Sequence, residues 1–212
     1  DKRLASTGTW SRKEARELIR AGRVAADGTV CRAPEQKVPE TAAVTVDGAP
    51  IGGGGPVYLM LNKPAGVVSS TEEPGERTVL DLLGEEYRNI GLFPAGRLDK
   101  DTEGLLLLTN DGPLAHRLLA PKSHVDKVYY VEVDGALDQD DVLAAREGMT
   151  LGDGTVCLPA ELELLSSNSA HITLREGKYH QVKRMMASRG KPVAYLKRVR
   201  FGPLRLDEGL AK

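Results

Sequence analysis

Cysteine is scarce in this chain of 212 residues, and no metal-binding pattern accompanies it. The two cysteines, Cys31 and Cys157, lie far apart, and neither has a second Cys or a His at metal-ligand spacing. We therefore expect two reduced thiols and no zinc site. The sequence also has no convincing phosphate-binding loop, which agrees with a protein that needs neither cofactor nor metal.

Long hydrophobic runs are absent as well. No stretch of about 18 apolar residues occurs, so the sequence predicts no transmembrane helix and no membrane partner. The chain begins at Asp1 without a signal-peptide pattern, and we expect a cytoplasmic protein that is a monomer. Its 41% hydrophobic and 28% charged residues are ordinary for a globular protein, and its length suffices for one large domain or two small ones.

An overall excess of positive charge is missing, since the formal net charge is −1. The total alone argues against a nucleic-acid partner, but the charges are unevenly distributed. Residues 127–165 contain two Lys or Arg and nine Asp or Glu, whereas residues 171–200 contain nine Lys or Arg and a single acid. A basic segment of this kind favours a polyanionic partner.

The chain divides at a run of four glycines. Residues 1–50 form a compact first part, residues 51–56 carry the glycine run and are interpreted as a linker, and residues 57–212 form the second part. A long hairpin tip is the alternative for the glycine run. We predict a small α/β domain followed by a larger one.

Local patterns predict the elements of both parts. Ser11 with Glu14 is a capping box for a helix over residues 12–20, and Asp27-Gly28 predicts a hairpin over residues 23–31. In the second part we expect strands at 57–61, 104–109, 128–133, 170–175 and 193–201, and helices at 78–83, 111–120, 138–147 and 179–188. The fold class is α+β, with a mixed, largely antiparallel sheet and flanking helices.

One face of the first predicted helix is rich in arginine. Arg12, Arg16 and Arg20 recur at every fourth position and Arg23 follows, so this face can track RNA phosphates. A solvated face with Glu–Arg pairs is the alternative. Together with Arg3 and the hairpin, residues 1–48 resemble the small helix-and-hairpin (alpha-L) RNA-binding module first described in a small-subunit ribosomal protein. The resemblance implies RNA docking through these five arginines.

Residues 95–112 join a polar, glycine-flanked loop to a buried apolar strand. Arg97, Asp99, Asp101 and Thr102 therefore lie near a rigid edge, although a turn capped by Asp99 is also possible. The run Gly96-Arg-Leu-Asp99 and its continuation resemble the signature of the RsuA branch of ribosomal RNA pseudouridine synthases. The resemblance implies the pseudouridine synthase fold, Asp99 as catalytic nucleophile and Arg97 as a contact to RNA around the extruded base. For Asp101 and Thr102 we expect loop hydrogen bonds.

Three further segments resemble the same family. In Lys127-Val-Tyr129 the resemblance implies that Tyr129 stacks on the target base, and in residues 174–185 it implies that Lys183 pairs with the catalytic Asp, where many relatives carry Arg. Residues 61–66 resemble the family's entry motif, in which Asn62, Lys63 and Pro64 could also be a strand end and turn. A phosphate-binding helix start is a second interpretation of residues 178–184. Together with Arg97, the RNA contacts expected from these segments are Lys63, His180, Gln181 and Arg184.

The implied reaction converts one uridine of ribosomal RNA to pseudouridine, breaking a C–N bond and forming a C–C bond to the same ribose. The base must leave the stack, Lys183 would keep Asp99 charged, and Tyr129 would hold the ring. The run 180–186 and the acidic region 131–147 resemble the small-subunit type of the family, which implies 16S ribosomal RNA in a small-subunit assembly particle as substrate. The alternatives are 23S ribosomal RNA, a non-enzymatic RNA-binding ribosome-assembly factor and a nucleoside hydrolase.

Overall fold

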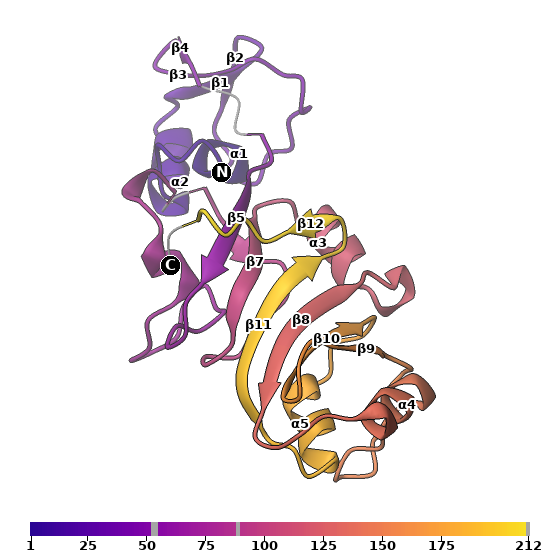
Figure 1. Cartoon of the computed structure of the whole chain (residues 1–212). Coiled ribbons are helices and arrows are strands. Elements are labelled where there is room, and N and C mark those ends of the chain that lie inside the picture. The colour runs from indigo at the N-terminus through magenta and orange to yellow at the C-terminus, as the bar shows by residue number, and fades with distance from the viewer. Residues whose placement is uncertain (52–54, 88–89, 211–212) are drawn as a thin grey trace. The chain divides into compact units, whose positions relative to one another are not determined.

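The computed structural model describes residues 1–51, 55–87 and 90–210 (Figure 1). Residues 52–54 of the predicted linker lie outside the described residues. Packing groups the chain into two units, one of Asp1–Tyr58, Leu80–Phe93 and Thr109–Asp111, the other of Leu59–Val79, Pro94–Leu108 and Gly112–Lys212. The domain boundaries at residues 50 and 57 stay a prediction.

The first unit combines two helices with a small sheet. Its helices are α1 (Lys2–Ala5) and α2 (Arg12–Arg20), and the strand order is β2 (Thr29–Cys31), β1 (Val24–Ala26), β3 (Val44–Val46) and β4 (Ala49–Pro50). The predicted capping box is present, because Ser11 Oγ accepts from the Glu14 backbone and the Glu14 carboxylate accepts from the Ser11 backbone. The apolar face of α2 packs Ala15 and Ile19 against the strands.

Both Asp-Gly pairs of this unit form tight hairpin turns. Asp27 and Gly28 have φ values of 47° and 78°, and Asp47 and Gly48 have 51° and 79°. Two successive positive φ angles are typical of the type I′ turn that Asp-Gly favours. The first hairpin was predicted. The second, between β3 and β4, was not predicted.

The larger sheet is mixed and mostly antiparallel, as predicted. Its order is β5 (Tyr58–Lys63), β7 (Glu103–Thr109), β11 (Val193–Phe201), β8 (Lys127–Val133), β10 (Ser169–Leu174) and β9 (Glu161–Leu164), with β6 (Phe93–Pro94) beside β7 and β12 (Leu204–Arg205) beside β11. Strand β11 is parallel to β7 and antiparallel to β8. Figure 1 shows β11 and β8 as long strands side by side in this sheet.

Helices α3 (Gly112–Leu119), α4 (Gln139–Glu147) and α5 (Gln181–Ser188) accompany this sheet. Val182, Met185 and Met186 of α5 are buried in the core with Ile172 and Leu196, as the sequence pattern predicts. The helix predicted at 78–83 is present as η1 (Val79–Leu82), a short 3-10 helix. Two further 3-10 turns are η2 (Glu85–Tyr87) and η3 (Pro121–Ser123). In the described parts of the chain, no helix has the length and apolar character needed to cross a membrane.

Gly104 allows β7 to lie directly against β11. Its φ is 102°, and a Cβ atom there would lie 2.3 Å from the Arg198 carbonyl oxygen. Only glycine tolerates both the positive φ and this approach. Gly104 follows the loop of residues 96–102. Its close contact with β11 therefore fixes the point at which this loop joins β7.

Candidate active site

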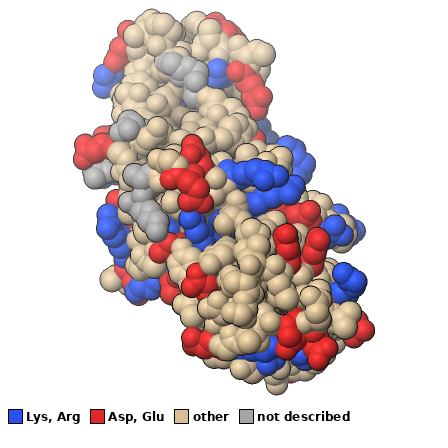
Figure 2. Space-filling view, viewed as in Figure 1, with Lys and Arg blue, Asp and Glu red and all other residues tan. Residues whose placement is uncertain are grey.

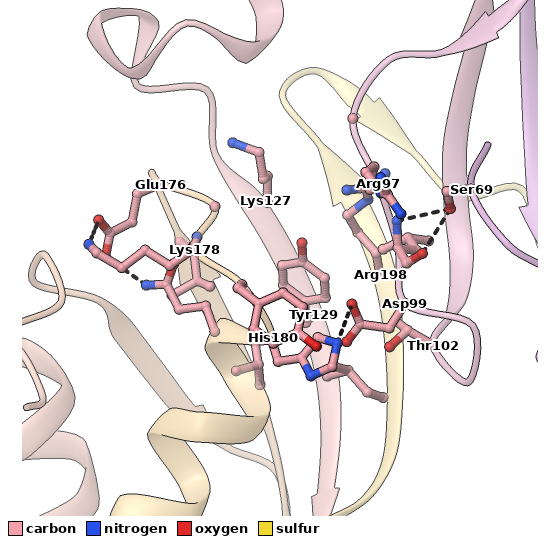
Figure 3. Close-up of a pocket in the computed structure, with 18 of the residues that line it drawn as sticks. Ser69, Arg97, Asp99, Thr102, Lys127, Tyr129, Glu176, Lys178, His180 and Arg198 are labelled. Atoms are coloured by element: carbon pink, nitrogen blue, oxygen red, sulfur yellow. Dashed lines mark hydrogen bonds and ion pairs between the residues drawn. The ribbon is translucent and has the colours of Figure 1, made fainter. Parts of the chain in front are cut away.

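A pocket of about 790 Å³ lies within the second unit, lined by the 96–102 loop, β8, the 175–180 loop and β11 (Figure 3). A space of this size can hold a nucleotide-sized group. Basic side chains outnumber acidic ones in its lining. The basic residues are Arg97, Lys100, Lys127, Arg175, Lys178 and Arg198, and the acidic ones are Asp99 and Glu176.

The backbone around Asp99 is held on both sides. Ser69 Oγ donates to the Leu98 carbonyl at 2.8 Å and accepts from the Leu98 backbone N–H at 3.1 Å. The Thr102 backbone N–H donates to the Asp99 carbonyl at 3.1 Å, which closes a turn. These contacts point the Asp99 side chain into the pocket from a fixed loop. Ser69 was not among the residues singled out from the sequence.

Two basic side chains of the α5 region reach the Asp99 carboxylate. Lys183 Nζ lies 2.9 Å from Oδ2, and His180 Nε2 lies 3.5 Å from Oδ1, as Figure 3 shows for His180. Lys183 also donates to Asp101 Oδ1 at 2.6 Å. The predicted pairing of Lys183 with Asp99 is therefore present as a contact, with Asp101 as a second partner that we did not expect.

Lys183 stays a cation in this arrangement. Burial alone would lower the pKa of Lys183, but its hydrogen bonds to Asp101 and Asp99 and their negative charges outweigh burial and raise the pKa. In return, the hydrogen bond from Lys183 is the main cause that lowers the pKa of Asp101. The Lys183 ammonium thus bridges two carboxylates at neutral pH.

Tyr129 lines the same pocket from β8. It pairs across the sheet with Ile172 on β10 and with Arg198 on β11. Its neighbour Tyr130 is not among the pocket residues, and its hydroxyl donates to Glu132 at 2.6 Å. Strand alternation explains why only Tyr129 faces the pocket.

The 175–180 loop is braced by Glu176 and Gln181. Glu176 accepts hydrogen bonds from the Leu158 backbone at 2.9 Å, from Gln181 Nε2 at 2.6 Å and from Lys178. Gln181 is only 5% exposed, and its Oε1 accepts from the Lys178 backbone at 2.8 Å. The structure therefore differs from the predicted RNA contact at Gln181, because its amide is used to fix the loop.

Comparison with known proteins gives two family matches. Residues 57–188 match the RNA pseudouridylate synthase family, and residues 1–44 match the S4 domain. This chain belongs to the RNA pseudouridine synthase family. It is thus an isomerase, and the resemblance found in the sequence is confirmed.

Individual relatives agree over nearly the whole chain. The chain is 42% identical to ribosomal small subunit pseudouridine synthase A of Vibrio cholerae, covering 99% of this chain and 91% of the relative. It is 46% identical to the RNA pseudouridine synthase YtzG of Bacillus subtilis, covering 100% and 90%. A crystal structure of a pseudouridylate synthase superposes with a TM-score of 0.70 at 34% identity, covering 99% and 90%.

Lys63 of this pseudouridine synthase is buried rather than exposed to RNA. Its side chain is 0% exposed, and its ammonium donates to the carbonyls of Pro64, Lys100 and Thr102 at 2.9, 3.2 and 2.9 Å. We therefore correct the predicted RNA contact. Lys63 ties the end of β5 to the loop that carries Asp99.

This burial predicts an unusual pH dependence of stability. Burial lowers the pKa of Lys63 from 10.5 to about 8, so between these values the unfolded chain binds more protons than the folded one. Stability contributed by this site therefore rises with pH in that window. We expect the slope of unfolding free energy against pH to be more positive in the wild type than in Lys63→Met, by up to about 1.4 kcal/mol per pH unit.

Urea titrations from pH 7 to 10 measure this slope. The matched control is Lys13→Met, which alters an exposed lysine of α2 and should leave the wild-type slope. Equal slopes in the wild type and Lys63→Met would contradict the account of Lys63.

Two further pocket cations, Lys127 and Arg198, had no role assigned from the sequence. Arg198 is 1% exposed, donates to the Leu105 carbonyl at 2.7 Å and lies 5.0 Å from the Phe201 ring centre. Its Nη2 has no hydrogen-bond partner in the described part of the chain. Lys127 lies 5.7 Å from the same ring, and burial, together with repulsion from Arg198, lowers its pKa. Their burial could not be deduced from local patterns.

The basic segment of residues 171–200 is largely neutralised in space. Seven of its nine cations form ion pairs, and six of these pair with acids outside residues 171–200, as in Arg184–Asp153 and Arg189–Asp141. On the face shown in Figure 2, Lys and Arg side chains gather over β12 and α3 instead. Segment charge alone therefore overstates the positive surface.

The arginines predicted to bind RNA in the first unit differ in whether their side chains already have hydrogen-bond or ion-pair partners. Arg3 donates to the carbonyls of Pro39 and Ala42, so it anchors the loop before β3. Arg12 and Arg16 pair with Asp1, and Arg23 pairs with Asp47, all on the surface. Arg20 is exposed, and no side-chain partner for it is found within the described residues. The structure thus presents Arg20 as the most available cation of the predicted face.

Proposed function

We propose that this pseudouridine synthase isomerises one uridine of small-subunit (16S) ribosomal RNA, with Asp99 as nucleophile. The observation that carries the proposal is the Asp99 carboxylate bound by Lys183 at 2.9 Å in a cation-lined pocket that also contains Tyr129. Similarity to relatives named ribosomal small subunit pseudouridine synthase A supports the choice of 16S.

The chemistry assigns a task to each of these side chains. The uridine leaves its stack and enters the pocket, where the Tyr129 ring supports the base. Asp99 acts as nucleophile while the C–N bond breaks, and the Lys183 ammonium holds its carboxylate in position. The detached base then bonds through C5 to the same ribose carbon, and any bond formed by Asp99 breaks in that step. The C5 hydrogen leaves as a proton, and the freed N1 takes up a proton. Atoms and electrons balance without an oxidant or an added group.

The RNA outside the pocket would be held by both units. Arg97, His180 and Arg184 lie at or beside the pocket and are assigned to the strands around the target. We assign residues 1–50 to RNA docking and residues 57–212 to catalysis, in keeping with the two family matches. Within the docking part, Arg12, Arg16, Arg20 and Arg23 would meet phosphates, and Arg3 would act by fixing the fold.

The availability of Arg20 gives a measurable prediction. Arg20→Ala removes one phosphate contact, so we expect ribosomal RNA affinity to fall about threefold at low salt. The slope of the logarithm of the association constant against the logarithm of salt concentration should become less steep by about 1, which corresponds to one lost phosphate contact. Filter binding from 50 to 300 mM salt measures both. Arg3→Lys is a useful contrast, because its effect should appear in thermal stability first; an unchanged salt slope in Arg20→Ala would contradict the docking role.

The proposed reaction is tested by release of the C5 hydrogen. Ribosomal RNA labelled with tritium at uridine C5 should lose about one tritium per 16S molecule when incubated with the purified protein. It should lose none from 23S RNA. Release from 23S alone would move the substrate to the large subunit, and release from neither RNA would overturn the proposal for these substrates.

A further inference from the structure

We infer that the stacked rings of Tyr179 and His180 at the pocket form a platform for a nucleobase that flanks the target uridine. The inference deepens the proposed function and rests on it. It assigns a binding role to Tyr179, which neither the sequence analysis nor the mechanism above uses.

The two rings already form a short stack. Their centroids lie 3.8 Å apart with an interplanar angle of 18°, and both residues line the pocket. Tyr179 is nevertheless 75% exposed, the highest exposure among the large exposed hydrophobic side chains. One face of its ring is covered by His180, so the exposed area must include the other face. An open aromatic face continuing a stack is the feature on which proteins place unpaired bases.

The platform is held in place by its backbone. His180 has φ 46° and ψ 39°, a left-handed conformation that is uncommon for residues other than glycine but enriched in His, Asn and Asp. The Tyr179 carbonyl accepts from Arg184 Nη1 at 3.3 Å, and Gln181 binds the Lys178 backbone on the other side. Such a conformation persists only where the surroundings enforce it, and it often marks a binding site.

The stack also leads directly to the reacting carboxylate. His180 Nε2 lies 3.5 Å from Asp99 Oδ1, so a base placed on Tyr179 is separated from Asp99 by two rings. A base at that distance from Asp99 cannot be the base of the target uridine. It fits a neighbour of the extruded uridine along the same strand.

The surrounding charge favours RNA as the occupant. Arg175 and Lys178 line the pocket but pair with Asp126 and Glu176, whereas Arg97 and Arg198 line it with no ion pair among the described residues. Phosphates on either side of a stacked base would meet these cations. Extruding a uridine also removes a stacking partner from its neighbour, and the Tyr179 ring would replace that partner. The platform should therefore strengthen binding of the opened RNA.

Substitution of the ring face tests the inference. We expect Tyr179→Ala to raise KM about 10-fold, with kcat at saturating RNA within about 3-fold of the wild type. Tyr179→Phe and Tyr179→Trp should restore the wild-type KM, because the ring face and not the hydroxyl is used. Leu143→Ala, which trims a 51% exposed side chain on α4 outside the pocket, is the matched control and should change neither constant.

A fluorescent base provides a readout that a structural role would not move. The RNA is a 16S fragment that contains the uridine modified by this protein. In it, 2-aminopurine replaces each nucleotide that flanks this uridine in turn. At one position its fluorescence should be quenched on binding the full-length wild type, and equally with Tyr179→Phe, but not with Tyr179→Ala. Quenching that persists in Tyr179→Ala, or a wild-type KM in that variant, would overturn the inference, as would a Tyr179→Phe defect as large as that of Tyr179→Ala.

Failure of this inference can be told apart from failure of the proposed function. Quenching is measured by binding alone and can be repeated with Asp99→Asn, so it does not depend on turnover. If the wild type releases tritium from RNA but Tyr179→Ala has the KM and the quenching of the wild type, the proposed reaction is supported and the proposed platform is wrong.

Discussion

Replacing Asp99 by Asn should abolish pseudouridine formation, with a fall in kcat of at least about 1,000-fold. The substitution keeps the size and hydrogen-bonding shape of the side chain but removes the negative charge and the nucleophilic oxygen. Loss of a nucleophile typically costs several orders of magnitude. Single-turnover tritium release from C5-labelled 16S RNA measures the loss, with circular dichroism as a check on folding.

The neighbouring Asp101 supplies the matched control. Asp101 lies on the same loop and accepts from the same Lys183 ammonium, but its side chain is 73% exposed. We expect Asp101→Asn to keep kcat within about 10-fold of the wild type. If Asp101→Asn lost as much activity as Asp99→Asn, the assignment of Asp99 as nucleophile would fail. The loss of activity in both variants would then be explained by disruption of the Lys183 bridge that the two carboxylates share.

Replacing Lys183 by Met should lower kcat about 100-fold and leave KM nearly unchanged. The Lys183 ammonium lies 2.9 Å from the Asp99 carboxylate and fixes its position, and Met removes this cation while keeping most of the side-chain volume. The bound RNA is held elsewhere in the pocket, so its affinity should change little. Steady-state tritium release over a range of RNA concentrations separates the two constants.

Lys183→Arg distinguishes the charge from the rest of the side chain. A guanidinium retains the positive charge and can bind a carboxylate with two parallel hydrogen bonds, so we expect it to restore activity to within about 10-fold of the wild type. A Lys183→Met enzyme with wild-type kcat would show that Asp99 needs no cation. Equal losses in Lys183→Met and Lys183→Arg would point to packing instead of charge.

Local signals in the sequence predicted most elements of the fold. The helix of α2 was readable because its capping box and its apolar spacing lie within about two turns, and the β1–β2 hairpin because Asp-Gly selects its turn. At η1 the sequence predicted a helix but not its 3-10 type, because the pattern is too short to separate one 3-10 turn from a longer helix. The β3–β4 hairpin was missed although Asp47-Gly48 carries the same signal as Asp27-Gly28.

The site was less readable, because its contacts join distant segments. Lys63 reaches the Thr102 carbonyl 39 residues away, and Lys183 reaches Asp101 across 82 residues. No local pattern reveals that one lysine is buried among carbonyls while the other bridges two carboxylates. Family resemblance indicated Asp99, Tyr129 and Lys183, whereas Lys63 and Gln181 needed the structure to show their burial.

The ion pairs explain why charge counted along the chain overstates the positive surface. Cations gathered in residues 171–200 meet acids contributed by other segments, such as Asp141 and Asp153. Folding therefore pairs most cations of this basic segment with carboxylates of the same chain. The cations that remain without a carboxylate partner in the described chain, above all Arg198 in the pocket, are better guides to an RNA site than the segment total.

Mapping pseudouridine in ribosomal RNA from cells that lack this protein tests the central claim most directly. Carbodiimide modification followed by primer extension locates each pseudouridine in 16S and 23S RNA. We predict that one 16S pseudouridine disappears, returns when the wild-type protein is supplied, and does not return with Asp99→Asn. An unchanged pseudouridine map in both RNAs, or full restoration by Asp99→Asn, would contradict the account.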